Sequence, residues 1–432
     1  STARVAHGPR GAGFARGGAE LPPLGGATAA VVAAVMLVLG GFGAFAFTIG
    51  GGGTALDATW TSDTARDVRA NHHAVGAGVV GGEGMVYAPI SGRADTPTCA
   101  LIGLDASDGS TEWRYGVPAA NCTIHAVATP TVADYDGDGE SEVLAATTER
   151  DVVAFDARSG DEEFRGNLTS YGYSEPVVAD LVGGPAAEVV VVDVRGALSV
   201  FDRNGSLLWR ERLGAYTWGQ PAAVDADGDG ETELVVGTRA GELWSFEGDG
   251  SVRWQRDAVG GVTWSAAGAV DGEPAVAVGT TNGSVALFDA GTGETRWRQS
   301  FGAYAAVHAF GDGDGDGTAE VYGVAQDGKL RSIDAASGDV EWTTTLTSAD
   351  VQMTPPPALG DPDGDGDDEL VAVTNDGRVS LVDPDDGAVL STRERSVPIY
   401  TYPTVADLNG DGREEAYVIY SDGRVVKLEV AE

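Results

Sequence analysis

The sequence predicts an all-β protein, an eight-bladed β-propeller preceded by a single transmembrane helix. Three observations support this fold: an acidic loop followed by paired strands recurs along the chain, an aromatic residue closes most copies, and one uncharged stretch stands near the start. Four short antiparallel strands in each repeat of about 45 residues are typical of propeller blades. A solenoid is the competing fold, but its period would be shorter and its strands parallel.

The uncharged stretch is residues 27–49. As a helix it would be about 35 Å long, enough to cross a bilayer core of about 30 Å. Arginines dominate the segment before it and acids the segment after it, so the positive-inside rule places the N-terminus in the cytoplasm. A cleaved signal peptide is the alternative, because small residues flank Phe45. The predicted domains are a disordered cytoplasmic tail (1–26), the transmembrane helix (27–49), a short Gly-rich linker (50–56) and an extracellular propeller (57–432).

The repeated loop is clearest in "ADYDGDGESEVLAAT", residues 133–147, where aspartates alternate with other residues and a glutamate stands at the ninth position. Four further intact copies begin at Val224, Gly311, Gly360 and Ala406. Two more copies are damaged: one keeps only the first and ninth positions, Asp180 and Glu188, and the other, which starts at Val270, has lost most of the loop.

Each loop is followed by an apolar strand, a tight turn such as "NDGR" that suits a type I′ hairpin, and a second strand. A further strand then carries an aromatic residue four positions after a glycine. The last repeat stops at Glu432 without this fourth strand, and the strand around Trp60 can complete it and leave no open sheet edge. Eight fourth strands give eight blades, or seven if the first repeat is irregular. Their marker residues are Trp60, Trp113, Phe164, Trp209, Trp254, Trp297, Trp342 and, in a degenerate copy, Ser391.

The acidic loops predict about five structural calcium sites. Calcium takes six to eight oxygen ligands, which side chains at positions 1, 3, 5 and 9 and the carbonyl of position 7 can supply. An EF-hand is excluded, because its glutamate stands at position 12 between helices. The loops hold no histidine or nucleophile, so a catalytic role for the metal is not expected. Acidic turns without metal are the alternative. The predicted ligands are Asp134, Asp136, Asp138, Glu140, Glu142; Asp225, Asp227, Asp229, Glu231, Glu233; Asp312, Asp314, Asp316, Thr318, Glu320; Asp361, Asp363, Asp365, Asp367, Glu369; and Asp407, Asn409, Asp411, Arg413, Glu415.

These loops resemble the FG-GAP (VCBS) repeats of integrin α-chain propellers. The Gly-x-x-x-Trp strand and the "FDA" phrase resemble PQQ-like quinoprotein propellers and BamB-like scaffolds. The resemblance covers residues 57–432. Quinoprotein dehydrogenases of this kind show adjacent cysteines beneath the cofactor, whereas Cys99 and Cys122 are far apart in this sequence.

The composition indicates the environment in which the protein works and excludes some partners. The formal net charge is −39, and such self-repulsion is tolerated best where high salt screens it, which predicts a haloarchaeal surface protein. The alternative explanation of the negative charge is an acidic surface made of calcium ligands. Nucleic acid is not an expected partner. Cys99 and Cys122 are too few for a zinc site and form a disulfide candidate if the domain is exported, although two free thiols stay open.

The loops opposite the calcium loops carry a second chemistry. Aromatics there suit sugar stacking or protein contact, and packing of the central channel is the alternative. A histidine metal site is less favoured, because the histidines come from at least three blades. The strand at Trp60 enters from the calcium side, so this second face should point away from the membrane. The partner-binding candidates are Tyr173, Tyr216, Trp218, Trp264, Met353, Tyr400 and Tyr402, with His72, His73, His125 and His308 nearby.

The predicted function is therefore a non-enzymatic, membrane-anchored recognition or scaffold propeller that binds a protein or glycan at the cell surface, for adhesion or assembly. One alternative is a subunit of a larger membrane or filament complex, and a more distant one is a PQQ-dependent quinoprotein dehydrogenase. Outside the membrane, glycans are expected at one or two of the sequons that begin at Asn121, Asn167, Asn204 and Asn282.

Overall fold

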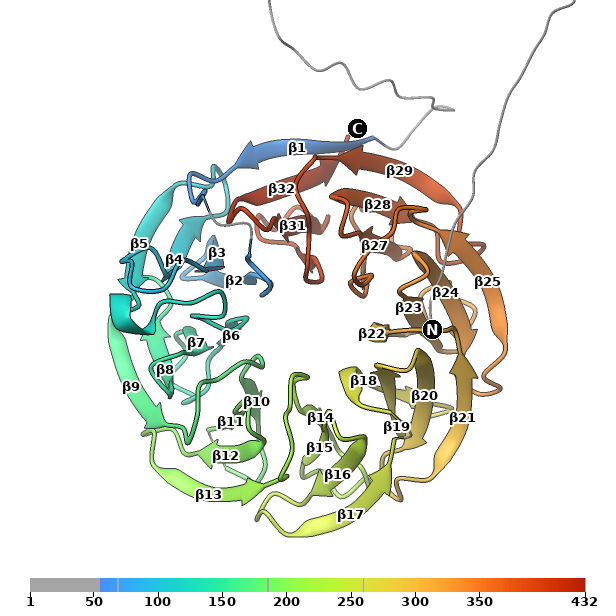
Figure 1. Ribbon diagram of the computed structural model, residues 1–432, viewed down its shortest axis with the longest axis horizontal. Coiled ribbons are helices and arrows are strands. Elements are labelled where there is room, and N and C mark those ends of the chain that lie inside the picture. The colour runs from blue at the N-terminus through green and yellow to red at the C-terminus, as the bar shows by residue number, and fades with distance from the viewer. Residues whose placement is uncertain (1–54, 68–69, 185, 259, 432) are drawn as a thin grey trace, which may run out of the picture. The chain divides into compact units, whose positions relative to one another are not determined.

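The computed structural model describes residues 55–431 except 68, 69, 185 and 259. Within them, eight four-stranded antiparallel sheets stand around a central axis (Figure 1). The predicted eight-bladed, all-β propeller is confirmed, and the seven-bladed alternative is wrong because the first repeat forms a complete sheet, β2-β3-β4-β5.

The strands form four concentric rings, counted outward from the axis. The innermost, first strands are β2 (Gly76–Val80), β6 (Thr131–Ala133), β10 (Val177–Ala179), β14 (Ala222–Val224), β18 (Val262–Val270), β22 (Ala305–Gly311), β26 (Ala358–Gly360) and β30 (Thr404–Ala406). The second strands are β3 (Glu83–Ile90), β7 (Glu142–Ala146), β11 (Glu188–Val192), β15 (Glu233–Gly237), β19 (Glu273–Thr280), β23 (Glu320–Ala325), β27 (Glu369–Val373) and β31 (Glu415–Ile419).

The third and fourth strands form the outer half of each blade. The third strands are β4 (Ala100–Asp105), β8 (Asp151–Asp156), β12 (Ala197–Phe201), β16 (Glu242–Phe246), β20 (Ser284–Asp289), β24 (Lys329–Asp334), β28 (Arg378–Val382) and β32 (Val425–Val430). The fourth strands are β5 (Thr111–Gly116), β9 (Glu162–Asn167), β13 (Leu207–Arg212), β17 (Val252–Asp257), β21 (Thr295–Ser300), β25 (Val340–Thr345), β29 (Val389–Glu394) and β1 (Leu56–Thr61). A 3₁₀ turn, η1 (Ala119–Asn121), follows β5.

The eighth sheet combines the two ends of the described chain, in the order β1-β32-β31-β30. Leu56 is opposite Val430, and Thr61 is opposite Val426. The backbone amide of Leu56 also donates to the Oγ of Ser391 in the seventh blade (3.0 Å). The degenerate fourth strand thus holds the eighth blade through a serine where other blades use an aromatic ring.

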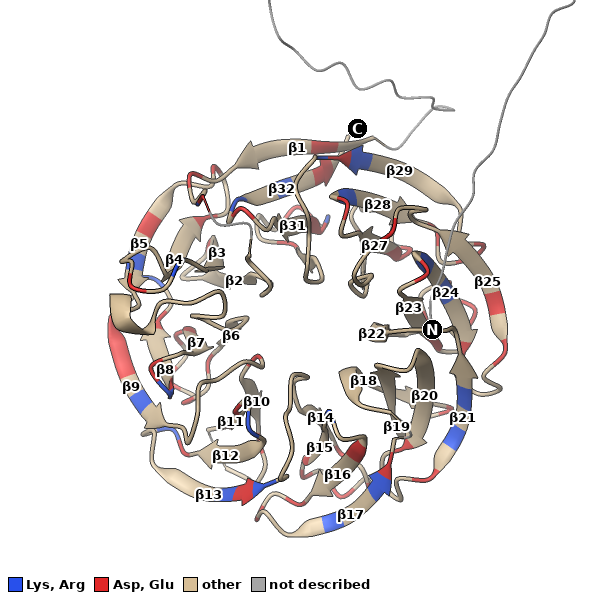
Figure 2. Ribbon diagram, viewed as in Figure 1, with Lys and Arg blue, Asp and Glu red and all other residues tan. Residues whose placement is uncertain are grey.

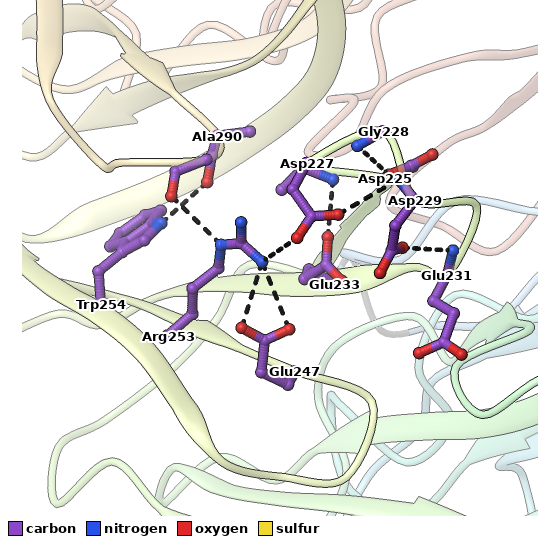
Figure 3. A network of polar contacts seen from close by, with 12 residues as sticks. Asp225, Asp227, Gly228, Asp229, Glu231, Glu233, Glu247, Arg253, Trp254 and Ala290 are labelled. Atoms are coloured by element: carbon purple, nitrogen blue, oxygen red, sulfur yellow. Dashed lines mark hydrogen bonds and ion pairs between the residues drawn. The ribbon is translucent and has the colours of Figure 1, made fainter.

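Fourth-strand tryptophans join each blade to the next. Trp254 Nε1 donates to the carbonyl of Ala290 in the following blade (2.8 Å; Figure 3). A Cβ added at Gly293 of that blade would lie only 2.6 Å from the ring, so a glycine is needed there. The glycine and the tryptophan of one repeat therefore serve opposite neighbours. Equivalent bonds join Trp60 to Ala106, Trp113 to Ala157, Trp209 to Gly248, Trp297 to Ala335 and Trp342 to Pro384.

Charge is excluded from the inner ring. None of the eight first strands contains Asp, Glu, Lys or Arg, and the charged residues lie on the outer strands and connecting loops (Figure 2). The eight strands nearest the axis therefore present no charged side chain, although the chain has a net charge of −39.

Among the residues that the structure describes, no helix has the length and apolarity required to cross a membrane. The predicted transmembrane helix (27–49), tail and most of the linker lie outside the described residues.

Candidate functional site

Two faces of the propeller carry distinct chemistry. The connections from first to second strands form the calcium-loop face. The connections from fourth to first strands and from second to third strands form the other end, which we call the mouth face. The acidic loops are all on the former, and the predicted partner-binding residues are all on the latter.

Each acidic loop is shaped by its own carboxylates. In the fourth blade, Asp225 Oδ1 accepts from the amide of Gly228 (2.7 Å), and its Oδ2 accepts from the amide of Gly230 (3.1 Å; Figure 3). Both glycines have positive φ, +77° and +93°, which other residues rarely adopt. Asp134, Asp361 and Asp407 make the same pair of contacts in their blades.

The glutamate at the ninth position is hydrogen-bonded to the start of its own loop. Glu233 is buried, and its Oε2 accepts from the amide of Ala226, the second loop residue (2.7 Å). Glu188 of the damaged third-blade loop makes the same bond to Leu181 (2.9 Å), although the acids between them are missing. This bond is therefore a structural feature of the blade that does not depend on the other loop acids. The same contact recurs at Glu142, Glu320 and Glu415.

Four loops bring three carboxylates together. In each, one oxygen per residue lies within 4.8 Å of the others, as a bound cation would require. Burial, followed by neighbouring acids, raises the pKa of Glu142 to about 8, and the same causes raise that of Glu369 to about 8. A hard divalent cation would relieve this repulsion, and the donors are the oxygens that calcium prefers. The groups are Asp134, Asp136, Glu142; Asp225, Asp227, Asp229; Asp312, Asp314, Asp316; and Asp361, Asp363, Asp365.

The residue that precedes the fourth-strand aromatic differs between blades, and its charge adds to that of the neighbouring acidic loop. In the fourth blade it is Arg253, which contacts Asp227 (2.9 Å) and Glu247 (3.2 Å; Figure 3). In the second and sixth blades it is an acid, Glu163 or Glu341, whose charge contributes to raising the pKa of the loop glutamate. The loops are alike in sequence but differ in net charge.

The eighth-blade loop differs further, because it contains its own cation. Lys427 Nζ lies 3.1 Å from Glu415 Oε1, and both side chains are almost fully buried. The side-chain amide of Asn409 donates to the same oxygen (2.6 Å). Glu415 Oε2 accepts from the Leu408 backbone amide (3.3 Å) and the Tyr417 hydroxyl (3.1 Å), so both oxygens of this carboxylate already have two protein partners. The donor set in this loop fits a metal poorly.

On the mouth face, connections from all eight blades line one cavity of about 240 Å³. The predicted residues Tyr173, Trp218, Trp264, Met353, Tyr400 and Tyr402 all line it. Tyr216 does not. It stands beside Trp218, with ring centroids 5.7 Å apart, and is 43% exposed. Residues separated by more than 200 positions in the chain thus form a single site, the mouth cavity.

Three of the four predicted histidines belong to the same cavity. The rings of His72 and His125 have centroids 5.1 Å apart, and those of His73 and His125 are 5.5 Å apart. Among the described residues, no set of three with histidine nitrogens meets the distance that the carboxylate groups satisfy. His308 lies deeper, stacked on Tyr402 at 4.1 Å. The histidines act as aromatic walls: burial lowers the pKa of His125 and of His308 to about 4, so both are neutral.

A constriction separates the mouth cavity from an inner cavity of about 510 Å³. Four residues line both cavities, and each directly precedes a proline that leads into a first strand. Proline favours an extended residue before it, which holds these side chains in one ring. The four are Thr129, Glu175, Gln220 and Tyr402.

Glu175 is the one carboxylate in the described lining of either cavity. Its Oε2 accepts from the Tyr402 hydroxyl (2.7 Å), and its Oε1 accepts from Thr131 Oγ1 (3.4 Å). Burial raises its pKa to about 7. The constriction can therefore hold a proton near neutral pH.

Cys99 and Cys122 are joined by a disulfide, which holds the loop that presents His125. The structure describes all four sequons: Asn167, Asn204 and Asn282 are exposed, and Asn121, beside the disulfide, is half-buried.

Sequence reasoning missed four residues of these sites: Glu175, Arg239, Tyr304 and Lys427. Glu175 stands two positions after Tyr173, as Gln220 does after Trp218 and Tyr402 after Tyr400. That shared spacing was the signal for the constriction. No comparable signal marks Arg239 or Tyr304, which reach the mouth from separate connections.

Comparison with known proteins gives the family. A family model described as outer membrane protein assembly factor BamB matches residues 135–312 and 245–432, which together exceed half of the chain. The chain belongs to this BamB family. The match supports the PQQ-like part of the predicted resemblance, and the FG-GAP likeness of the loops stays a resemblance. No curated protein matches the chain.

Solved structures show the same fold at low sequence identity. BamB from Moraxella catarrhalis is 16% identical with a TM-score of 0.60, and the match covers 87% of this chain and all of that one. Sqt1 from Saccharomyces cerevisiae is 10% identical with a TM-score of 0.66, covering 88% of this chain and all of that one. A quinohemoprotein alcohol dehydrogenase from Pseudomonas putida is 13% identical with a TM-score of 0.56, covering 87% of this chain and 76% of that one. Enzymes and assembly factors share this fold, so function depends on the site.

Proposed function

We propose that this BamB-family chain is a non-catalytic recognition or scaffold propeller. Its mouth face binds a protein or glycan partner at the outer side of a membrane, and acidic loops on the opposite face hold structural calcium. The observation that carries this proposal is the mouth cavity, where aromatic and histidine rings from seven of the eight blades converge, with Met353 from the remaining blade. Aromatic side chains supply large contact area with a polar edge and dominate recognition sites.

Structural calcium fits four of the loops. Their carboxylates come within 4.8 Å of one another, and each loop joins the first two strands of its blade. The bound ion would neutralise these acids and fix the first hairpin, while the protein residues provide the oxygen cage. We leave the eighth-blade loop out of this assignment because Lys427 already neutralises Glu415.

A catalytic role has less support. The one carboxylate of the described channel lining, Glu175, already accepts hydrogen bonds from the hydroxyls of Tyr402 and Thr131. The disulfide joins cysteines 23 positions apart, whereas the quinoprotein pattern has adjacent cysteines.

A subunit role in a larger membrane complex is the second candidate, and the description of the family as an outer membrane assembly factor favours it. In that case the partner is a protein, and it could contact the blade sides instead of the mouth. The predicted anchor and the direction of the two faces relative to a membrane remain predictions.

The test is affinity capture from membranes of the source organism, in high salt with calcium. The full chain is compared with a triple variant, Trp218→Ala, Trp264→Ala and Tyr400→Ala. The control is Leu208→Ala, which removes an exposed apolar side chain from an outer strand. Loss of the partner only in the triple variant, with an unchanged melting temperature, supports the proposal. Equal capture by all three proteins would refute the mouth as the binding surface.

A further inference from the structure

The mouth cavity contains an unusual concentration of unpaired nitrogen atoms. Ten buried side-chain polar atoms in the described chain have no hydrogen-bond partner. Four of them belong to residues that line this cavity, and a fifth belongs to Arg239, which stacks on Trp218 of the cavity wall. Buried polar groups are normally paired, so a cluster of exceptions points to a missing ligand. His73, only 5% exposed, is the most enclosed of those that line the cavity wall. The five atoms are His72 Nδ1, His73 Nε2, His125 Nδ1, Trp218 Nε1 and Arg239 Nη1.

All five of these atoms can act as hydrogen-bond donors. Indole and guanidinium nitrogens can only donate, and a neutral histidine donates from one of its two nitrogens. The unmet capacity of the cavity is therefore mainly for hydrogen-bond acceptors. A ligand rich in oxygen atoms would satisfy it better than an apolar one.

A positive charge lies directly against the wall of the cavity, on Arg239. The guanidinium of Arg239 stacks over the ring of Trp218 at 3.9 Å and lies 5.9 Å from the ring of Tyr304. It forms no ion pair with any carboxylate that the structure describes, although acids outnumber bases in the chain by 66 to 27. A half-buried guanidinium with no acidic partner suits a carboxylate, which it can bind through two parallel hydrogen bonds.

The walls and the size restrict the shape of the ligand. Flat faces of Tyr173, Trp218, Trp264 and Tyr400 line a cavity of about 240 Å³, below the roughly 300–1,000 Å³ of drug-sized sites. One ring fits such a space better than a length of polypeptide. Of the large exposed apolar side chains in the described chain, only Ile124 and Tyr216 lie on the mouth face. That is little apolar surface for a protein interface, whose core is rich in such groups.

We propose that the mouth cavity binds the terminal uronic acid of an acidic glycan. The sugar ring stacks on the aromatic walls, its hydroxyl oxygens accept from the histidine and Trp218 nitrogens, and its carboxylate pairs with Arg239. This inference deepens the proposed function, because it names the class of partner for the same face.

The test uses the full chain and two matched probes. One is a hyaluronan disaccharide that ends in its single glucuronic acid, and the other is its carboxyl-reduced form, in which that sugar becomes glucose. Binding is measured by calorimetry and by tryptophan fluorescence, since Trp218 and Trp264 line the cavity. The acidic probe should bind about tenfold more tightly than the reduced one, the usual effect of one charge-assisted hydrogen bond.

Two arginine variants separate the specific charge from net charge. Arg239→Gln should lower the affinity for the acidic probe to that for the reduced probe. Arg298→Gln, which removes an exposed arginine from the outer strand β21, should leave both affinities unchanged. Equal binding of both probes to the unmodified chain, or an equal effect of both variants, would overturn the assignment of the acid to Arg239.

Failure of this inference is distinguishable from failure of the proposed function. If neither probe binds, but the triple aromatic variant still loses a captured protein, the glycan assignment is wrong and the recognition face stands. If neither probe binds and capture is unaffected by the triple variant, both are wrong.

Discussion

Lys427 shows how one residue can change the chemistry of a repeated loop. The corresponding place in the third strand is Ser245 in the fourth blade and Ser332 in the sixth, and only the eighth blade has a lysine there. Its ammonium occupies the charge-balancing role that a calcium ion would have in the other loops. The loop sequence alone predicts a metal, and the residue that argues against it lies 12 positions beyond Glu415.

We predict that the unmodified chain binds four calcium ions and that Lys427→Ser binds five. In chelator, the variant should be less stable by about 3 kcal/mol, because the buried Glu415 loses its partner. Added calcium should restore most of that loss. Metal analysis after equilibrium dialysis gives the stoichiometry, and thermal melting gives the stability. Five ions in the unmodified chain would contradict this assignment.

The raised pKa of Glu175 predicts how the stability of the protein depends on pH. Its pKa is about 7 in the folded protein, above the ordinary value of 4.5, so the fold favours the protonated form. Unfolding therefore releases a proton between pH 4.5 and 7, and the contribution of Glu175 to stability falls as the pH rises through that window. Glu175→Gln removes this loss. Relative to the unmodified chain, the variant should gain about 3 kcal/mol between pH 4.5 and 8.

Thermal melts of both proteins at several pH values check this prediction. Glu294→Gln, at an exposed turn, is the control and should show no such trend. A constant difference between Glu175→Gln and the unmodified chain at all pH values would show that Glu175 is ionised in the folded protein throughout.

At the scale of the strand and blade, the tryptophan contact is the main joint. The sequence shows a glycine and a tryptophan at a fixed spacing, but the spacing alone does not show what either residue contacts. In the structure they contact different blades, because the fourth strand lies at the outer edge, next to the following sheet. Periodicity reveals that a position is structural, but it cannot show which neighbour the side chain reaches.

We predict that Trp254→Ala lowers the free energy of unfolding by about 3–5 kcal/mol, as expected for a large buried ring. Trp254→Phe keeps most of the ring and loses the hydrogen bond to Ala290, at a cost of about 1–2 kcal/mol. Trp244→Phe is the matched control, because Trp244 Nε1 has no partner in the described chain. Denaturant unfolding measures all three. An equal cost for the two phenylalanine variants would mean that the inter-blade hydrogen bond contributes nothing.

At the scale of the whole molecule, the propeller separates structure from recognition. The connections from first to second strands contain the acidic loops, and the connections at the opposite end line the mouth cavity. The eight first strands, which contain no charged residue, lie between these two ends (Figure 2). The repeat period was enough to predict eight blades and to assign each loop to a face. It could also place Tyr173, Trp218, Trp264 and Tyr400 at one end, because they occupy the same place in their blades.

The depth and polarity of the mouth were beyond sequence reasoning. His72 and Tyr400 stack at 4.7 Å although more than 300 residues separate them. Arg239 and Tyr304 come from single connections that have no repeated pattern. Such contacts follow from closing the ring, and a repeat alone does not specify them.

The most direct test of the account is site-specific photocrosslinking of the full chain in its native membranes. A photoreactive phenylalanine analogue replaces Tyr400 on the mouth face or Val182, exposed at 49%, on the calcium-loop face. The account predicts a specific adduct from position 400 and none from position 182. An adduct from position 182 alone would place recognition on the acidic loops and contradict the proposed role of the mouth.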